Sequence, residues 1–361
     1  MNHEDYMQTA LDLAEKGMGY TSPNPMVGAV IVKNGEIIGK GYHRKYGELH
    51  AERNAFADCH EDCSGADLYV TLEPCCHHGK TPPCTDIIIQ KNIKRVFIGS
   101  SDPNPKVAGK GVSILREHGI EVIEGVLKDK CDRLNEIFFH YITTKKPFVT
   151  MKYAMTMDGK IACRTGKSKW ITAETARQYV QYERLRHSAI MVGVGTVIAD
   201  NPLLTCRLEN GRNPVRIICD TNLRTPLDSE IVKTARDIPT IIAVCSDDTE
   251  KISQYENYGC RVMTVRESGG HTDLNDLMDK LGADGIDSIL IEGGGELNYS
   301  ALRSGIVNKV QAYIAPKVFG GRDAKTAVCG LGVECPDEAF VLEHTAIRRI
   351  GDDFLIESWV K

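Results

Sequence analysis

The sequence predicts an α/β protein built from two domains. Strand and helix signals alternate through the first half, and apolar strand candidates separated by helical segments recur through the second. A chain of 361 residues is also long for a single hydrophobic core. Between the halves stands Pro147, which cannot continue a helix and keeps the preceding residue out of the helical region. We therefore expect one domain over residues 1–145 and a second over residues 146–361.

The first half gives its local signals in order. A helix is predicted over roughly 3–17, where Gly17 and Gly19 end it. Apolar runs on either side of Asn34-Gly35 predict a hairpin. The pattern then predicts a helix from about His50, a strand at 66–72, a helix at 85–92, a strand at 94–100, a helix at 109–119, a strand at 120–125 and one helix from 129 to the residue before Pro147.

The second half opens on an apolar run at 147–162. Strand candidates follow at 189–195, 214–220, 240–246, 287–295 and 309–316, separated by helical segments. The glycine-rich stretch 320–339 is expected to be a loop near a cofactor or an interface, and the sequence assigns it no role.

The composition argues against several classes of protein. A hydrophobic fraction of 42% and a charged fraction of 26% are ordinary for a soluble globular protein. A net charge of −5 gives no general attraction to nucleic acid or to anionic membranes. There is no run of about 18 apolar residues, and the N-terminal segment is too acidic and polar for a signal peptide. Because most of the thirteen cysteines are scattered singly, we expect reduced thiols in a cytoplasmic protein.

One cluster of residues has the pattern of a hydrolytic zinc site. Such a site needs three protein ligands, a fourth position for water, and a general acid/base nearby. His50 and Glu52 supply a ligand and a carboxylate at the start of a helix, while Cys75 and Cys84 each follow proline. Zinc-dependent base deaminases carry this combination, although eight residues separate the two cysteines here, which is more than their usual spacing.

The same cluster leaves alternatives open. A closed structural site with four protein ligands is one, but such sites usually come as two close pairs of ligands. Cys76 is a poor candidate for the same ion because neighbouring side chains diverge. We expect His77 to contact a substrate and His78 to be exposed. Lys80 suits an anionic substrate, or it is simply a solvated lysine.

These segments resemble a known family. TSPNPMVGAVIV, HAE, TLEPCCHHGKTPPC and SDPNPKVAGKG resemble the deaminase half of the bifunctional riboflavin-biosynthesis deaminase–reductases, and the cysteine spacing with GKTPPC is characteristic of that family. The resemblance continues through MKYAMTMDGKIA, GKSKWIT, VGVGTVIADNPLLTCRL and LIEGGG, so it covers nearly the whole chain. It implies a cytidine-deaminase-like zinc domain over residues 1–145 and a dihydrofolate-reductase-like domain that uses NADPH over residues 146–361.

The resemblance also implies two reactions on a phosphorylated pyrimidine. The first is hydrolytic deamination of 2,5-diamino-6-(5-phosphoribosylamino)pyrimidin-4(3H)-one. The second is NADPH-dependent reduction of the ribosyl chain, which gives 5-amino-6-(5-phosphoribitylamino)uracil. It further implies a homo-oligomer, with no nucleic-acid or membrane partner.

In the first domain the resemblance implies zinc ligands, an acid/base and substrate contacts. The implied zinc ligands are His50, Cys75 and Cys84, and Glu52 is the residue that transfers protons. The implied substrate contacts are Asn24, His43, His77 and Lys80, with Asp102 and Asn104 as weaker candidates.

In the second domain the resemblance implies a cofactor set and a substrate set. The implied NADPH contacts are Ala154, Trp170, Thr196, Asp200, Thr221, Asn222, Gly293, Gly294 and Gly295. The implied substrate contacts are Lys152, Ser168, Arg184, Leu204, Arg207 and Glu292. Arginine pairs grip phosphate well, and Lys152 or Asp200 would orient or protonate the opening sugar.

Plainer interpretations of the second domain remain open at this point. The arginines could form surface ion pairs, Trp170 could belong to the core, and three glycines could mark only a tight strand–helix turn. Two other functions also compete. One is a nucleic-acid base deaminase with an added domain, which would want a basic, aromatic-lined channel. The other is a protein without catalysis, in which zinc only holds the fold together.

Overall fold

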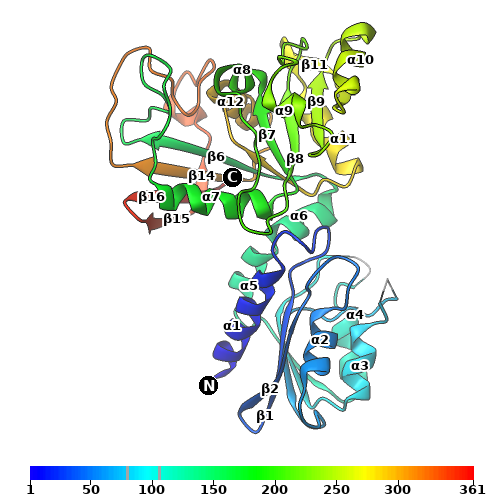
Figure 1. The fold of residues 1–361 in the computed structure, drawn as a ribbon. Coiled ribbons are helices and arrows are strands. Elements are labelled where there is room, and N and C mark those ends of the chain that lie inside the picture. The colour runs from blue at the N-terminus through cyan, green and yellow to red at the C-terminus, as the bar shows by residue number, and fades with distance from the viewer. Residues whose placement is uncertain (79–80, 105–106) are drawn as a thin grey trace. The chain divides into compact units, whose positions relative to one another are not determined.

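The computed structural model describes residues 1–78, 81–104 and 107–361 (Figure 1). The implied substrate contact Lys80 lies outside these residues. The chain forms two compact units, Met1–Lys145 and Lys146–Lys361. Within the described ranges, no helix has the length and apolar character needed to cross a membrane.

The first unit is built on a five-stranded sheet with the strand order β2-β1-β3-β4-β5. Its strands are β1 (Gly28–Lys33), β2 (Glu36–Tyr42), β3 (Asp67–Leu72), β4 (Arg95–Ser100) and β5 (Glu121–Glu124). The hairpin predicted at Asn34-Gly35 is present, because Lys33 pairs with Glu36 and both turn residues have positive φ. The other strands run parallel from β3 to β5.

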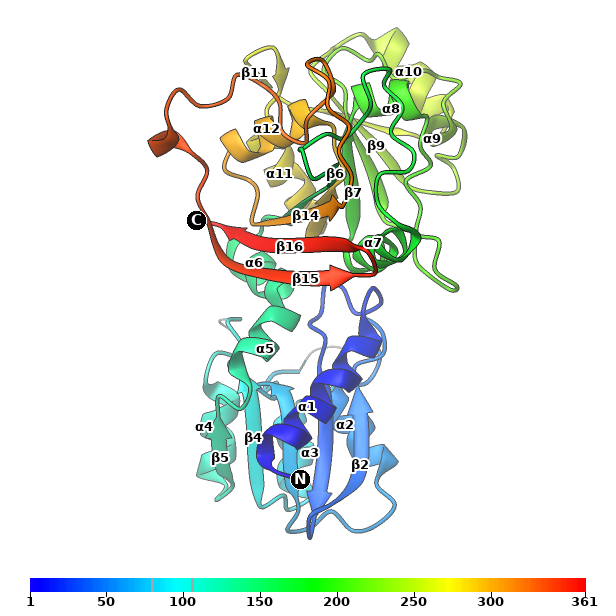
Figure 2. The same ribbon diagram turned by 90° about the vertical axis from the view of Figure 1, so that its left-hand side faces the viewer.

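Helices cover both faces of this sheet (Figures 1 and 2). They are α1 (His3–Ala14), α2 (Ala51–Asp58), α3 (Cys84–Gln90), α4 (Lys110–Glu117) and α5 (Lys128–Leu134), and α6 (Glu136–Thr144) ends the unit. The strands alternate their apolar side chains between two cores. Ile31, Val70 and Ile98 pack with α2, α3 and α4, whereas the intervening Val30, Tyr69 and Phe97 pack with α1 and α5.

Helix α2 lies unusually close to β2. A Cβ atom on Gly41 would lie 2.2 Å from the backbone nitrogen of Ala55, and one on Gly39 would lie 2.5 Å from the Ala55 carbonyl oxygen. The Asn54 side chain also donates a 2.8 Å hydrogen bond to the carbonyl of Tyr42. These contacts fix the helix that carries His50 at its N-cap and Glu52 in its first turn.

The single helix predicted from residue 129 to Pro147 is wrong. The chain forms α5 and α6 instead, separated at Asn135 with φ −106° and ψ 18°. The Asn135 side chain accepts a hydrogen bond from the backbone nitrogen of Met26 and donates one to its carbonyl, both at 2.9 Å. These hydrogen bonds to a residue far away in the sequence stabilise the break between α5 and α6. The predicted helix at 3–17 also ends earlier, and a 3-10 turn at Glu15–Gly17 completes it.

The second unit is built on a nine-stranded sheet with the order β10-β9-β8-β7-β13-β6-β14-β16-β15. Its strands are β6 (Phe148–Thr156), β7 (Ala189–Gly193), β8 (Val215–Cys219), β9 (Thr240–Val244), β10 (Arg261–Thr264), β13 (Ser288–Ile291), β14 (Lys309–Ala315), β15 (Leu342–Ile350) and β16 (Asp353–Val360). A separate ribbon pairs β11 (Glu267–Ser268) with β12 (His271–Thr272). All neighbours from β10 to β14 are parallel, and β16 and β15 add antiparallel strands.

The helices of this unit are α7 (Glu174–Arg186), α8 (Val194–Asp200), α9 (Glu230–Lys233), α10 (Thr249–Asn257), α11 (Leu274–Ala283) and α12 (Gly295–Arg303). The five predicted strands are present as β7, β8, β9, β13 and β14, and β6 lies in the predicted apolar run, whereas β10, β11, β12, β15 and β16 had no sequence prediction. The stretch 320–339 is a loop as expected, with one 3-10 turn at Pro336–Glu338. Parallel strands end at a common edge, where α/β proteins bind their ligands.

Candidate active sites

A cavity of about 380 Å³ opens in the first unit. Three of the predicted substrate contacts, Asn24, His43 and His77, line it together with Glu52. Asn24 donates from its amide to His43 Nε2 at 3.2 Å, and His43 Nδ1 pairs with the carbonyl of Leu49 at 3.1 Å. The weaker candidates Asp102 and Asn104 line the same cavity. The structure therefore gathers every predicted deaminase position that it describes.

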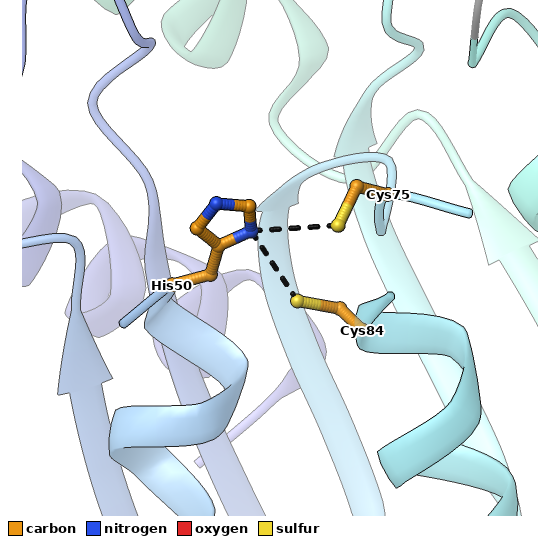
Figure 3. A group of neighbouring side chains, drawn as sticks. All are labelled: His50, Cys75 and Cys84. Carbon is orange, nitrogen blue, oxygen red and sulfur yellow. Dashed lines mark hydrogen bonds between the residues drawn. The ribbon is translucent and has the colours of Figure 1, made fainter. Parts of the chain in front are cut away.

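The three predicted zinc ligands lie close together (Figure 3), and two of them, His50 and Cys75, line this cavity. Their donor atoms all lie within 4.8 Å of one another, and among the described residues no fourth histidine, cysteine or acidic residue joins the group. His50 Nδ1 lies 3.4 Å from Cys75 Sγ and 3.5 Å from Cys84 Sγ. Zinc bonds of about 2.0 Å to nitrogen and about 2.3 Å to sulfur place tetrahedral ligands about 3.5 Å apart. The donor set and its spacing therefore fit zinc.

Local structure explains how residues distant in sequence meet. His50 is the N-cap of α2, and Cys84 is the first residue of α3 after Pro82-Pro83. The backbone nitrogen of Cys84 donates to the carbonyl of Cys75 at 3.0 Å, which closes the long connection between them. The Arg53 guanidinium also donates to the carbonyls of Pro82 and Pro83, at 3.3 and 2.8 Å.

The two cysteines differ in electrostatics, because the pKa of Cys75 is lowered whereas the Cys75 side chain and burial raise that of Cys84. Hydrogen bonds from Cys84 and His50 lower the pKa of the Cys75 thiol, and a thiolate is the form of cysteine that binds metals. The Cys75 side chain in turn raises the pKa of His50. Burial raises the pKa of Glu52, whose side chain also hydrogen-bonds Cys84. Glu52 is thus a buried carboxyl group that contacts Cys84 without belonging to the group of three metal-binding residues.

The residues next to the ligands differ in their burial and in their position relative to the cavity. Cys76 is partly buried but lies outside the ligand group. His77 and His78 are both exposed, and only His77 lines the cavity. Sequence reasoning missed Thr81, whose hydroxyl lies 3.4 Å from His50 Nε2, and the buried Glu73. A sequence signal for Glu73 existed, namely an acidic residue directly after a buried strand.

In the second unit, Arg184 and Glu292 form the centre of a charged group. The Arg184 guanidinium donates two hydrogen bonds to the Glu292 carboxylate, at 2.7 and 2.8 Å, and a third to the carbonyl of Thr205 at 2.8 Å. Their side chains are only 12% and 9% exposed, so this is not a surface ion pair. Lys152 of β6 lies near enough to both to affect their charges, and Arg207 acts on Glu292.

Charge balance decides the protonation of this group. Burial alone would raise the pKa of Glu292, but Arg184 and Lys152 lower it to about 2. Burial lowers the pKa of Lys152. Glu292 directly follows β13, whose last residue Ile291 pairs with Met151 of β6, so the sheet register sets Glu292 beside Lys152. Four of the six predicted substrate positions thus form one charged group.

The predicted glycine turn lies at the start of α12. Gly293 has φ +106° with open space where a side chain would stand, and Gly294 is an N-cap without a side-chain cap. A Cβ on Gly294 would lie 3.5 Å from the hydroxyl of Thr196. Free backbone N–H groups at a helix N-terminus suit a phosphate. Packing also favours glycine at position 295, because a Cβ atom there would lie 2.5 Å from Cys329 Sγ.

The remaining predicted positions lie on several elements. Trp170 is 58% exposed and packs under the Arg177 guanidinium at 4.5 Å, so the alternative of a core tryptophan is wrong. The others occupy loops, helix ends and one strand. Ala154 is on β6, Ser168 lies between β6 and α7, Asp200 ends α8, Leu204 is buried in the following loop, and Thr221 and Asn222 follow β8.

Comparison with known proteins identifies the family. The model of the cytidine and deoxycytidylate deaminase zinc-binding region matches residues 1–100, and that of the RibD C-terminal domain matches residues 147–356. Riboflavin biosynthesis protein RibD of Actinobacillus pleuropneumoniae is 57% identical over 99% of this chain and 95% of its own. The RibD of Bacillus amyloliquefaciens is 43% identical over 97% and 94%.

Solved structures agree over the whole chain. Acinetobacter baumannii RibD has a TM-score of 0.87 at 33% identity and covers 99% of this chain and 98% of its own. A Thermotoga maritima protein described as a diaminohydroxyphosphoribosylaminopyrimidine deaminase/5-amino-6-(5-phosphoribosylamino)uracil reductase has a TM-score of 0.86 at 41% identity, with the same coverage. The predicted fold class is confirmed, and the alternative of a protein without catalysis is wrong. The chain belongs to the RibD family of riboflavin biosynthesis, in which a zinc-binding deaminase domain precedes a reductase domain of dihydrofolate-reductase-like fold.

Proposed function

We propose that the first unit deaminates 2,5-diamino-6-(5-phosphoribosylamino)pyrimidin-4(3H)-one and that the second reduces the ribosyl chain of the product with NADPH. The final product is then 5-amino-6-(5-phosphoribitylamino)uracil. One observation carries the proposal: three metal-binding donor atoms within 4.8 Å of one another stand beside a buried carboxylate at the edge of a cavity. The name of the Thermotoga maritima relative supports the choice of substrates.

In the deaminase, His50, Cys75 and Cys84 would hold zinc. When bound, zinc supplies Lewis-acid chemistry that makes water a nucleophile near neutral pH. Glu52 takes a proton from the attacking water and passes it to the ring nitrogen. It then takes the proton of the newly added hydroxyl group and gives it to the departing amino group, which leaves as ammonia. Asn24 and His43 are hydrogen-bonded to each other in the cavity wall, which supports their proposed contact with the pyrimidine. His77 and Lys80 complete the proposed substrate contacts.

In the reductase, NADPH would lie along Ala154, Trp170, Thr196, Asp200, Thr221, Asn222 and the Gly293–Gly295 turn. When bound, it supplies the hydride for C1′ of the sugar. The substrate would contact Lys152, Ser168, Arg184, Leu204, Arg207 and Glu292. The Arg184–Glu292 pair supports this role, because it holds a guanidinium beside Lys152, and Arg207 adds a further positive charge close enough to act on Glu292. Several cations held close together suit a phosphorylated sugar.

We further propose that the protein works in the cytoplasm as a homo-oligomer, on this small molecule and without nucleic acid or membrane. All thirteen cysteines are free thiols, which suits a reducing compartment.

The test uses purified zinc-loaded protein with the diaminopyrimidine, with and without NADPH, followed by mass spectrometry. Without NADPH we expect loss of the amino group only, and with NADPH we expect a subsequent gain of two hydrogens. Glu52→Gln should abolish ammonia release while zinc content and reduction of the deaminated product persist. Ammonia release at the wild-type rate in Glu52→Gln would refute the role of Glu52.

A further inference from the structure

The buried carboxylate of Glu73 is an anchor between two parts of the deaminase cavity. Glu73 is 3% exposed and stands between β3 and the ligand Cys75. Its two oxygens accept four backbone hydrogen bonds: from Asp102 at 3.4 Å, Gly109 at 3.0 Å, Gly111 at 3.0 Å and Val112 at 3.3 Å. Among the described residues, no other carboxylate that lines the cavity accepts four backbone hydrogen bonds. The backbone around Glu73 is therefore arranged specifically to bind its side chain.

One end of this anchor is the metal side of the cavity. The backbone nitrogen of Glu73 donates to the carbonyl of Ser100 at 2.9 Å, which extends the parallel pairing of β3 with β4 by one residue. Cys75 follows two residues later. The position of the Glu73 backbone therefore determines where the Cys75 thiolate can lie.

The other end is the part of the cavity wall formed by Asp102 and Asn104. The Asp102 backbone is bound directly to Glu73, and the Asp102 carboxylate accepts a 2.8 Å hydrogen bond from the backbone nitrogen of Asn104. Both side chains line the cavity. The Glu73 side chain thus links the segment of Cys75 to this wall, in addition to the main-chain hydrogen bond from Glu73 to Ser100.

The surrounding backbone is shaped for this carboxylate. Gly109 is the N-cap of α4 and has no side-chain cap of its own, so Glu73 supplies the cap from another element. A Cβ atom on Gly111 would lie 2.3 Å from the Pro74 carbonyl oxygen and 3.1 Å from Glu73 Oε1. A negative charge at a helix N-terminus is favourable, and four N–H donors match its two oxygens.

We propose that Glu73 is a positioning residue for deamination, which sets the distance between Cys75 and the wall formed by Asp102 and Asn104. The inference rests on the proposed deaminase function. A glutamine at this position would offer one oxygen and turn its NH₂ group toward backbone donors, so at least half of the anchor is lost. The substrate then meets a wall that has moved relative to the metal ligands.

The experiment compares full-length, zinc-loaded wild type with Glu73→Gln and with Leu115→Ala. Leu115 is fully buried on α4, so its truncation weakens the packing of that helix without touching the anchor. For Glu73→Gln we expect unchanged zinc per chain, a raised KM and a fall of about 10- to 100-fold in deaminase kcat/KM. Reduction of the deaminated product should be unchanged. Leu115→Ala should lower thermal stability but leave KM at the wild-type value.

A second measurement needs no substrate. Amide hydrogen exchange should accelerate at Asp102, Gly109 and Gly111 in Glu73→Gln relative to Leu115→Ala, because these amides lose their acceptor. A wild-type KM in Glu73→Gln, or the same rise of KM in Leu115→Ala, would overturn the proposal. If the wild type fails to deaminate the diaminopyrimidine, the proposed function fails instead, and the exchange data still decide whether the anchor exists.

Discussion

Replacing Glu292 by glutamine should change how the stability of the second unit depends on pH. In the wild type, Glu292 is nearly buried, accepts two hydrogen bonds from Arg184, and lies close to Lys152. Glu292→Gln removes the only negative charge of this group and leaves three cations, Lys152, Arg184 and Arg207, without compensation. Removing one partner of a buried pair typically costs about 3–5 kcal/mol, so we expect a marked loss of stability at pH 7.

The pKa of Glu292 gives the size of the pH effect. It falls from an ordinary value of 4.5 to about 2 in the folded protein. The unfolded chain therefore binds the proton first as the pH drops. The stabilisation is complete above pH 4.5 and is lost as the pH falls toward 2. At about 1.4 kcal/mol for each pH unit, the total is roughly 3 kcal/mol.

Tryptophan fluorescence isolates this unit, because the two tryptophans of the chain, Trp170 and Trp359, both belong to it. Urea unfolding at pH values from 7 to 3 would give the stability difference between wild type and Glu292→Gln. That difference should shrink below pH 4.5. Glu296→Gln, at an exposed position on α12, controls for simple loss of a carboxyl group. A difference that stays constant down to pH 3 would refute the assigned charge state of Glu292.

Three further predictions concern the first unit. Cys84→Ser should lose most of its bound zinc, whereas Cys76→Ser, outside the ligand group, should keep it; equal zinc contents measured by atomic absorption would contradict this assignment. Removing zinc with a chelator should abolish ammonia release, while circular dichroism should show most of the structure retained. The reason is that the hydrophobic cores on both faces of the sheet do not contain the zinc ligands. Unfolding of the unit on chelation would instead indicate a structural metal. Gly41→Ala should destabilise the unit by about 1–3 kcal/mol and weaken zinc binding, because its Cβ would lie 2.2 Å from the Ala55 nitrogen and push α2 outward. If the variant kept the thermal stability and zinc content of the wild type, this prediction would be wrong.

Features set by neighbouring residues could be predicted from the sequence. The Asn34-Gly35 hairpin needs only a two-residue turn between apolar runs, and it formed as predicted. The grouping of His50, Cys75 and Cys84 was accessible because each ligand stands at a helix start or directly after a strand. The exposed edge strand β15 was missed because its burial shows little of the alternation that marks a half-buried strand.

Features that depend on distant partners could not be predicted. The break at Asn135 depends on Met26, which is 109 residues away in the sequence. The function of Glu73 depends on donors 29 to 39 residues further along the chain. In the second unit, the pairing of Arg184 with Glu292 spans 108 residues and requires the inserted position of β13 between β7 and β6. No local pattern encodes such contacts.

The last helix of the first unit determines where the deaminase unit can be separated from the reductase unit. Phe138, Tyr141 and Ile142 of α6 line the cavity that holds the zinc ligands, although the family match for the zinc-binding region ends at residue 100. A deaminase truncated at that point would keep every metal ligand and lose a wall of its substrate cavity. A working excised deaminase must therefore run to about residue 145, and substitutions just before the domain junction can alter substrate selection as much as substitutions beside the metal.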